Sequence, residues 1–306
     1  MQRNFGSHFG NTRIYHQNGF EIHETELYVE GITKPLTVFL FSDIHLAYTD
    51  RRDCDATRDL VVQRRLYFPC APDIFEQIIV YTKEQKPDLS IFLGDIIDFP
   101  SDKNLEILKG LDEPGFGPYL YHLGNHDDNF PWESATPEQT TAYRERIDVF
   151  SRDKCGIYKD VTPEACKQDK AGFHAVDLGE LIIAGGDNVS SEGIASIKKG
   201  LHILEACGKP VILCAHLPFH SETLDPLVIQ VWLSATRLKE IEPMLSENNN
   251  LVSVFAGDVH FFDNNMASGV LPQIISTSTE NKFKEEPAGA GPSYWSGIGI
   301  VRILPC

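Results

Sequence analysis

The chain has 306 residues, of which 42% are hydrophobic and 23% charged, and its formal net charge is -17. This composition is typical of a folded globular protein with a substantial core. A charge this negative disfavours broad electrostatic binding to a long nucleic acid, but a small anionic substrate could still enter a metal-lined cleft, because bound divalent ions reverse the charge locally.

Cysteine usage and the N-terminal residues favour a cytoplasmic protein. The seven cysteines are odd in number and widely spaced and form no C-x-x-C pair, so neither a disulfide framework nor a redox motif is indicated. Residues 1–10 lack the apolar core of a signal peptide, and no apolar run approaches the ~20 residues that span a bilayer. We expect reduced thiols and no transmembrane segment, while the oligomeric state stays open.

Five short runs of β-branched and aromatic residues are predicted to be strands, and each ends at residue types that bind metals. Strands that end in such loops bring functional groups to one edge of a sheet, so we expect these loops to meet. The runs cover residues 36–41, 89–93, 119–123, 211–214 and 251–255. They lead into Asp43-Ile44-His45, Gly94-Asp95, Gly124-Asn125-His126-Asp127, Ala215-His216 and Gly257-Asp258-Val259-His260.

Helical periodicity separates these strands. Apolar residues recur with helical spacing from Ile74 to Ile79, after Pro72-Asp73, and from Ile194 to Leu204; a third helix is predicted after Pro226. The alternation of strands and helices predicts a layered α/β fold. Later strands are predicted at 173–178, 181–184, 271–276 and 297–303, with a tight hairpin turn around Glu180 that indicates mixed rather than parallel sheets.

The clustered residues are chemically a metal site. Asp, His and Asn supply oxygen and nitrogen donors without a thiolate, which suits divalent Mn, Zn, Fe, Co or Ni and argues against an iron-sulfur or cysteine-zinc centre. Any one of Asp43, Asp95 or Asn125 alone would more commonly form a turn or cap a helix. Five such endings in this order indicate an assembled site.

Together the motifs D-x-H, G-D, G-N-H-D, a lone His and G-x-x-H, from Leu36 to His260, resemble the calcineurin-like binuclear metallophosphoesterase family. The resemblance implies an αββα sandwich of two mixed β-sheets flanked by helices, with two divalent metal ions at one edge. It also implies the ligands. Asp43, His45, Asp95 and His260 would hold one metal, and Asp95, Asn125, His216 and Asp258 the other, with Asp95 as the bridge.

By the same resemblance, His126 would lie over the substrate phosphate rather than bind a metal. Its imidazolium would stabilise charge in the transition state or protonate the leaving oxygen. Asp127 would then lie behind it and either orient that imidazole or stabilise its charge.

This sequence differs from the family pattern at two positions. Asp258 stands where most relatives carry a histidine, and the added carboxylate favours Mn²⁺, with Fe, Zn, Co and Ni as alternatives. Asp98, three residues after the bridging carboxylate, stands where the purple acid phosphatase branch has a metal-binding tyrosine, which argues against that branch. Asp98 is then either a group behind the ligands or a turn residue.

Two insertions are predicted within a single domain that covers residues 1–306. The first, about 46–71, is rich in arginine, and Arg51 and Arg52 are candidates for substrate binding; the alternative is a solvated charged helix. The second, about 128–170, begins with aromatic residues that either contact the substrate or pack against the domain. His220, close to His216 in the sequence, is a third candidate substrate contact.

The sequence therefore predicts a metal-dependent phosphoesterase that hydrolyses a small phosphodiester, nucleotide or pyrophosphate-type substrate by attack of a metal-bridging hydroxide. One alternative is a phosphomonoesterase with the same site. Another is a non-catalytic metal-binding scaffold of the same fold, which would have lost ligands or His126. Every predicted ligand position holds a competent donor, so catalysis is favoured.

Overall fold

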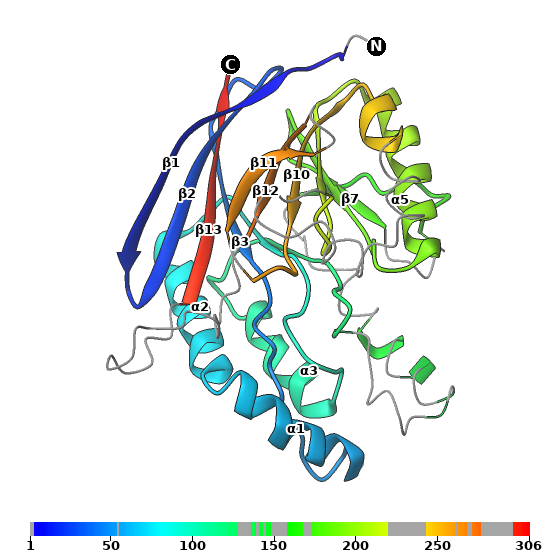
Figure 1. Cartoon of the computed structure of the whole chain (residues 1–306). Helices are drawn as coiled ribbons and strands as arrows, with labels where there is room; N and C mark the ends of the chain where they lie inside the picture. Colours follow the sequence, from blue (N-terminus) through cyan, green and yellow to red (C-terminus); the bar gives the residue numbers. More distant parts are fainter. Residues whose placement is uncertain are drawn as a thin grey trace.

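Two β-sheets pack face to face in the computed structural model, and helices lie against their outer faces (Figure 1). This is the αββα sandwich of mixed sheets that the resemblance implied. The structure describes residues 3–53, 55–127, 158–167, 173–219, 243–260, 262–267, 271–276 and 296–306, together with parts of 136–147.

The first sheet is mixed. Within the described residues it contains, in spatial order, β1 (Ser7–Gln17), β2 (Phe20–Val29), β13 (Ser296–Pro305), β3 (Leu36–Phe41), β4 (Leu89–Phe92) and β5 (Tyr119–Tyr121). Strands β3, β4 and β5 run parallel, whereas β13 is antiparallel to β3. The carboxyl ends of β3, β4 and β5 therefore lie at the same edge, where the first three motifs follow.

The second sheet is also mixed. Its described strands, in spatial order, are β11 (Asp263–Ala267), β12 (Leu271–Ile275), β10 (Leu251–Ala256), β9 (Val211–Cys214), β8 (Ile182–Gly185), β7 (His174–Asp177) and β6 (Lys159–Asp160). Strands β8, β9 and β10 are parallel, so the two remaining motifs follow neighbouring strand ends. The predicted hairpin turn joins β7 to β8 and is closed by the Leu178 amide, which donates to Leu181 O at 2.9 Å.

Three apolar cores separate the four layers. One lies between the first sheet and its helices and contains Phe41 together with Phe75 and Ile78 of α2 (Ala71–Gln85). A second packs α5 (Ser191–Leu204) on the second sheet, and the third fills the space between the sheets. Further helices are α1 (Asp55–Tyr67), α3 (Asp102–Leu108) and the 3₁₀ turns η1 (Lys109–Asp112) and η2 (Glu205–Cys207), and residues 243–247 are also helical.

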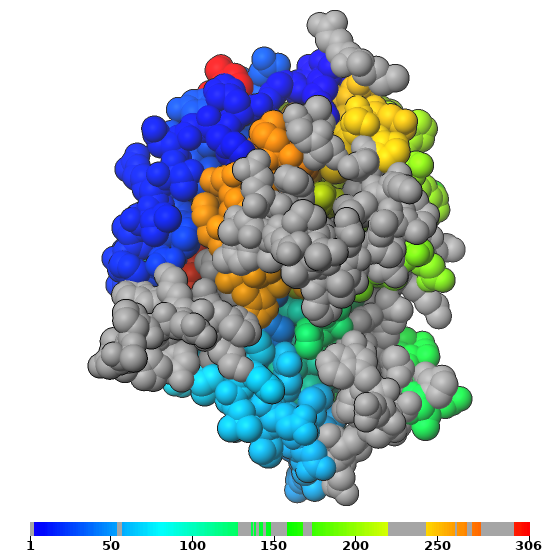
Figure 2. All heavy atoms as spheres, in the orientation of Figure 1, coloured from blue at the N-terminus to red at the C-terminus, as the bar shows by residue number. Residues whose placement is uncertain are grey.

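An N-terminal hairpin that the strand predictions missed extends the first sheet. Asn18 and Gly19 connect β1 to β2 with φ of 51° and 85°, the left-handed pair that a two-residue type I′ turn requires. Its strands lie along one outer side of the molecule, coloured blue in Figure 2. The hairpin also touches the second sheet, since the Asn264 amide donates to the hydroxyls of Thr12 and Thr25 at 3.0 Å.

The predicted strands are confirmed within one or two residues at each end. Both predicted helices are also present, but α2 begins three residues before Ile74 and ends six after Ile79, and α5 begins three residues before Ile194. The helix predicted after Pro226 lies outside the described residues. Among the helices that the structure describes, none combines the length and apolar character needed to cross a bilayer.

A histidine that is not a candidate ligand is buried between the sheets, two residues before the G-N-H-D motif. His122 is 1% exposed and stacks on His174 with ring centroids 4.6 Å apart, and neither of its ring nitrogens has a hydrogen-bond partner among the described residues. Burial, reinforced by His174, lowers the pKa of His122 well below its usual value. His122 is therefore neutral in the folded protein across the pH range in which a free histidine titrates.

We expect replacement of His122 by phenylalanine to flatten the acid dependence of stability. Below the unfolded pKa of about 6.5, His122 binds a proton in the unfolded wild-type chain but not in the folded one. The free energy of unfolding therefore decreases by about 1.4 kcal/mol for each pH unit by which the pH is lowered. Denaturant unfolding of the metal-free variant between pH 5 and 8 should show a free energy of unfolding without that pH dependence. A packing cost of the substitution would lower the free energy by the same amount at every pH and leave its slope unchanged. His202→Asn, on an exposed helix face, is the control. Equal slopes in wild type and His122→Phe would contradict the expectation.

Candidate metal centre

Five of the seven predicted ligands have left-handed backbone. Their φ angles lie between 53° and 68°, and in the part of the chain that the structure describes only Asn18 and Lys86 are other non-glycine residues with positive φ. Such conformations cost on the order of 1–3 kcal/mol each and concentrate at functional sites. They turn the chain sharply after each strand, so that the side chain faces the sheet edge. The five are Asp43, His45, Asp95, Asp258 and His260.

Glycine lets two of these loops approach each other closely. A Cβ atom on Gly94 would lie 2.6 Å from Gly124 N and 2.6 Å from His216 Nδ1, and Gly94 itself has a φ of 95°. Any side chain there would push apart the loops that carry Asp95, Asn125 and His216. The glycines in the G-D and G-N-H-D motifs thus belong to the assembly of the site.

The first group of candidate ligands is Asp43, His45 and His260, whose ligand atoms lie within 4.8 Å of one another. Asp43 Oδ2 accepts hydrogen bonds from the Ser42 hydroxyl and from the Asp258 amide. This orients Oδ1 towards His260 Nε2 at 3.4 Å and His45 Nε2 at 4.0 Å. The two Nε2 atoms are themselves 3.4 Å apart.

The second group converges on His216. Its Nε2 lies 3.1 Å from Asn125 Oδ1, 3.4 Å from Asp95 Oδ2 and 3.5 Å from Asp258 Oδ1. Asp43, Asp95 and His216 also place ligand atoms within 4.8 Å of one another, so Asp43 takes part in both groups. The structure therefore brings together all seven residues that the sequence predicts as ligands.

The hydrogen bonds behind these residues suit metal ligation. His216 Nδ1 donates to Leu93 O at 2.8 Å, and His45 Nδ1 donates to Asp98 Oδ1 at 2.9 Å. Each bond fixes the tautomer in which Nε2 carries a lone pair that faces the cluster. The imidazole nitrogens converge with buried carboxylate oxygens, and this combination of donors suits a divalent cation.

The buried charges are strongly coupled. Burial lowers the pKa of His216, but Asp95 and Asp258 outweigh it, so the pKa lies well above its usual value. Burial likewise opposes a raised pKa at His260, where Asp43 and Asp95 prevail. Burial raises the pKa of Asp95, yet His216, His126 and His45 together hold it below its usual range. A bound divalent cation would replace these protons as the partner of the carboxylates.

Asp127 has a different partner from the one predicted. Its buried carboxylate accepts hydrogen bonds from the amides of Gly124 and of Asp95, Ile96 and Ile97, and from the Tyr121 hydroxyl, at 2.7–3.1 Å. The expectation that it orients the His126 ring is therefore wrong, because these donors use both oxygens. Asp127 instead fixes the backbone of the loop that presents Asp95.

Asp98 is the carboxylate that contacts His126. Its Oδ1 lies 3.2 Å from His126 Nδ1 and also accepts from His45. Burial raises the pKa of Asp98, but His45, His126 and Arg64 outweigh it and hold the pKa below its usual range. Of the two interpretations left open by the sequence, Asp98 is a group behind the ligands rather than a turn residue.

The predicted substrate contacts are less well supported. Arg51 lies exposed in the turn before α1, and the Arg52 guanidinium pairs with Asp50 and Glu106 on the surface. Within the described structure, no hydrogen bond or ion pair joins either arginine to a candidate ligand. His220 and the start of the second insertion lie outside the described residues. Arg64, from the same insertion, is the arginine that reaches the site.

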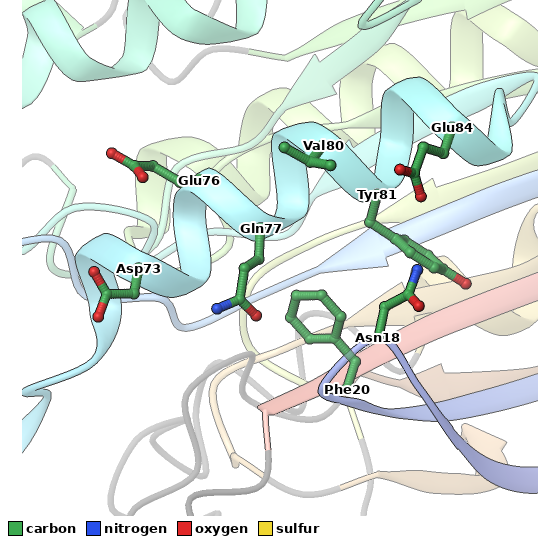
Figure 3. Close-up of a pocket in the computed structure, with 8 residues that line it drawn as sticks. All are labelled: Asn18, Phe20, Asp73, Glu76, Gln77, Val80, Tyr81 and Glu84. Atoms are coloured by element: carbon green, nitrogen blue, oxygen red, sulfur yellow. The ribbon is translucent and has the colours of Figure 1, made fainter.

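A separate groove of about 620 Å³ lies between the β1–β2 turn and α2 (Figure 3). Three acidic residues of α2 line it, and none of its lining residues is a candidate ligand or His126. The groove is therefore distinct from the metal centre. Its lining residues are Asn18, Phe20, Asp73, Glu76, Gln77, Val80, Tyr81 and Glu84.

A protein-family model covers the whole of this candidate centre. The family model of calcineurin-like phosphoesterases matches residues 36–262, which include every candidate ligand. A purple acid phosphatase from yellow lupin (Lupinus luteus) has a similar fold at 13% identity and a TM-score of 0.50; the match covers 92% of this chain and 46% of that one. A dimetal phosphatase from Danio rerio matches at 14% identity and a TM-score of 0.49, over 79% of this chain and 87% of that one. No curated protein matches the chain.

Proposed function

The chain belongs to the calcineurin-like phosphoesterase family, and we propose that it hydrolyses a phosphodiester, nucleotide or pyrophosphate-type bond in a small phosphorylated substrate. The family uses two divalent metals, and the clustered histidines and aspartates could hold them. When bound, such ions lower the pKa of water and polarise phosphate oxygens. The side chains of the protein would hold these ions, set the charge of the site and donate a proton to the leaving group.

The observation that carries the choice of substrate is the position of Asp258, 3.5 Å from His216 Nε2. Three carboxylates, on Asp43, Asp95 and Asp258, leave two divalent ions with one net positive charge, whereas a histidine at 258 would leave two. A dianionic monoester gains more from the extra charge than a monoanionic diester does. The extra carboxylate therefore supports a diester or pyrophosphate bond over a monoester.

The same carboxylate supports Mn²⁺ as the native metal. Asp258 and Asn125 both present oxygen to the second group, beside a single imidazole from His216. Oxygen-rich sets suit Mn²⁺ better than nitrogen-rich or sulfur-rich sets do. Iron, zinc, cobalt and nickel are the alternatives that metal analysis of the purified protein would test.

His126 is the residue we assign to the leaving group. Its side chain is 16% exposed, and its ring centroid lies 4.9 Å from that of His45. Burial lowers its pKa, but Asp95 and Asp98 outweigh burial and raise it above the usual value. A histidine that stays protonated near neutral pH can donate a proton to a departing oxygen.

Asp258→His is expected to shift the preference towards monoesters. The kcat/KM ratio for bis(4-nitrophenyl) phosphate over 4-nitrophenyl phosphate should fall about tenfold or more, since one unit charge at ~4 Å contributes up to ~4 kcal/mol at an effective dielectric constant of 20. Asp258→Asn is the matched control for charge, because it removes the charge but keeps an oxygen donor, and it should shift the ratio in the same direction. An unchanged ratio in both variants, with two metals bound, would refute the charge argument.

A non-catalytic scaffold is the competing possibility. It predicts a protein that binds metal but releases no phenol from either ester. The assembled ligands and the Asp98–His126 contact favour the enzyme, because a scaffold has no use for a proton donor beside the metals. Turnover by the Mn²⁺-loaded protein that disappears with chelator decides between the two.

A further inference from the structure

Arg64 enters the site from α1, outside the five loops that carry the ligands. Thr57, Val61 and Phe68 are buried and repeat with helical spacing, and Arg64 lies on the same face of the helix. Its side chain is only 17% exposed. Packing of α1 therefore directs this guanidinium inward, although the helix as a whole is rich in exposed arginine and other polar residues.

The contact between Arg64 and Asp98 is bidentate. Arg64 Nε donates to Asp98 Oδ2 at 2.8 Å, and Nη2 donates to Oδ1 at 2.6 Å. This geometry fixes the plane of the carboxylate as well as its position. The guanidinium is held in turn over the Phe68 ring, 5.0 Å from its centroid.

Asp98 transmits this orientation to two histidines. The same Oδ1 that Arg64 holds lies 2.9 Å from His45 Nδ1 and 3.2 Å from His126 Nδ1. Phe68 adds a second constraint, since it stacks on the His45 ring with centroids 4.1 Å apart. One turn at the end of α1 thus constrains both a candidate metal ligand and the proposed proton donor.

We propose that Arg64 is a positioning residue, which acts through Asp98 to align His126 for proton donation. It aligns His45 for metal binding through Asp98 and also directly, because its Nη2 lies 3.1 Å from His45 Nδ1. The inference rests on the proposed function for its catalytic part. It assigns a role to the insertion at 46–71 that differs from direct substrate contact by Arg51 or Arg52. Arg64 itself need not touch the substrate.

The first test is metal affinity of the metal-free protein. Titration with Mn²⁺ should show Arg64→Ala binding about 10–100-fold more weakly than wild type, the usual cost of losing a partner behind a ligand. Arg64→Lys should fall between them, because an ammonium cannot hold both carboxylate oxygens in one plane. Arg65→Ala is the matched control. Arg65 is the next residue of α1 and contacts Ala47 O and the Tyr48 ring instead.

The second test is a double-mutant cycle under saturating Mn²⁺. Arg64→Ala should lower kcat about 10–100-fold for aryl diesters with weakly acidic phenols and less for 4-nitrophenyl esters. In a His126→Ala background, Arg64→Ala should cause almost no further loss, because its effect passes through His126. Losses that multiply in the double variant would overturn the proposal, as would Arg64→Ala behaving like Arg65→Ala in both tests.

These readouts separate the inference from the proposed function. If the wild type hydrolyses no phosphoester, the proposed function fails, and the Mn²⁺ titration still decides the role of Arg64. Weakened binding in Arg64→Ala alone would then support the positioning role, and unchanged binding would overturn it. Thermal unfolding of the metal-free variants shows whether either substitution merely destabilises the fold.

Discussion

Replacing Asp95 with asparagine is expected to weaken both metal sites and to abolish turnover. Asp95 is the only carboxylate that shifts the pKa of all four site histidines, His45, His126, His216 and His260, among the largest contributions described for each. Because it acts on histidines of both ligand groups, we expect Asp95 to bridge the two ions, as the family resemblance implies. An amide carries no negative charge with which to bridge two cations. The loss of metal affinity should therefore exceed the ~10–100-fold that follows from removing a residue behind a ligand.

Elemental analysis and Mn²⁺ titration of the purified variant measure this result. The wild type should bind two ions per chain, and Asp95→Asn should bind neither at concentrations that fill the wild type. Asp53→Asn is the matched control, because Asp53 is also a buried carboxylate that accepts backbone hydrogen bonds, from Asp50 and Asp102, but lies outside the ligand groups. A wild-type stoichiometry of one, or full binding by Asp95→Asn, would exclude a shared ligand.

The ligand set could be predicted from the sequence because each ligand is tied to a strand by a few residues. Once residues 36–41 and 89–93 are recognised as strands, the loops after them have little freedom, and Asp43 and Asp95 must emerge at the same edge. The structure adds the reason that local patterns cannot state. These residues adopt left-handed backbone, at a cost that only the assembled site explains.

The contacts behind the ligands could not be predicted in the same way. Asp127, which follows His126 in the G-N-H-D motif, was expected from the resemblance to orient that imidazole. Three of its five donors are the amides of residues 95–97, about thirty residues away in the sequence, which the pairing of β4 with β5 brings near. The carboxylate that is adjacent to His126 in the sequence is thus not the one that contacts its ring; Asp98 makes that contact.

The sequence contained a signal that would have identified Arg64 as the arginine that faces the site. Five arginines lie between residues 46 and 71, and a count of charges cannot say which of them faces inward. The spacing of Val61 and Phe68 as the apolar face of a helix would have placed Arg64 on the buried side. In the N-terminal hairpin, Asn18-Gly19 between two alternating runs was likewise a strong turn signal.

His126→Ala is expected to keep both metals and lose on the order of 10²–10⁴ in kcat, the usual range for removal of an acid-base group. The His126 ring is held by Asp98 at 3.2 Å and is not among the atoms that converge on His216 Nε2 or on Asp43 Oδ1. Its backbone amide, which donates to Asp95 Oδ1 at 2.8 Å, is retained by alanine. His126 also lies with His45 and Asp98 in a group whose ligand atoms are within 4.8 Å of one another, so the metal content of the variant is the measurement that separates a proton donor from a ligand.

The dependence on leaving group and pH distinguishes proton donation from simple charge stabilisation. The loss should be smallest for 4-nitrophenyl esters, whose leaving group needs no proton, and should grow as the leaving phenol becomes less acidic. Asp95 and Asp98 raise the pKa of His126. For esters of weakly acidic phenols, wild-type turnover should therefore persist above pH 6.5 and decline as the pH rises further. The variant should lack this decline. If His126→Ala instead loses a metal ion, or loses the same factor for every leaving group, His126 is a ligand or an electrostatic group and not the acid.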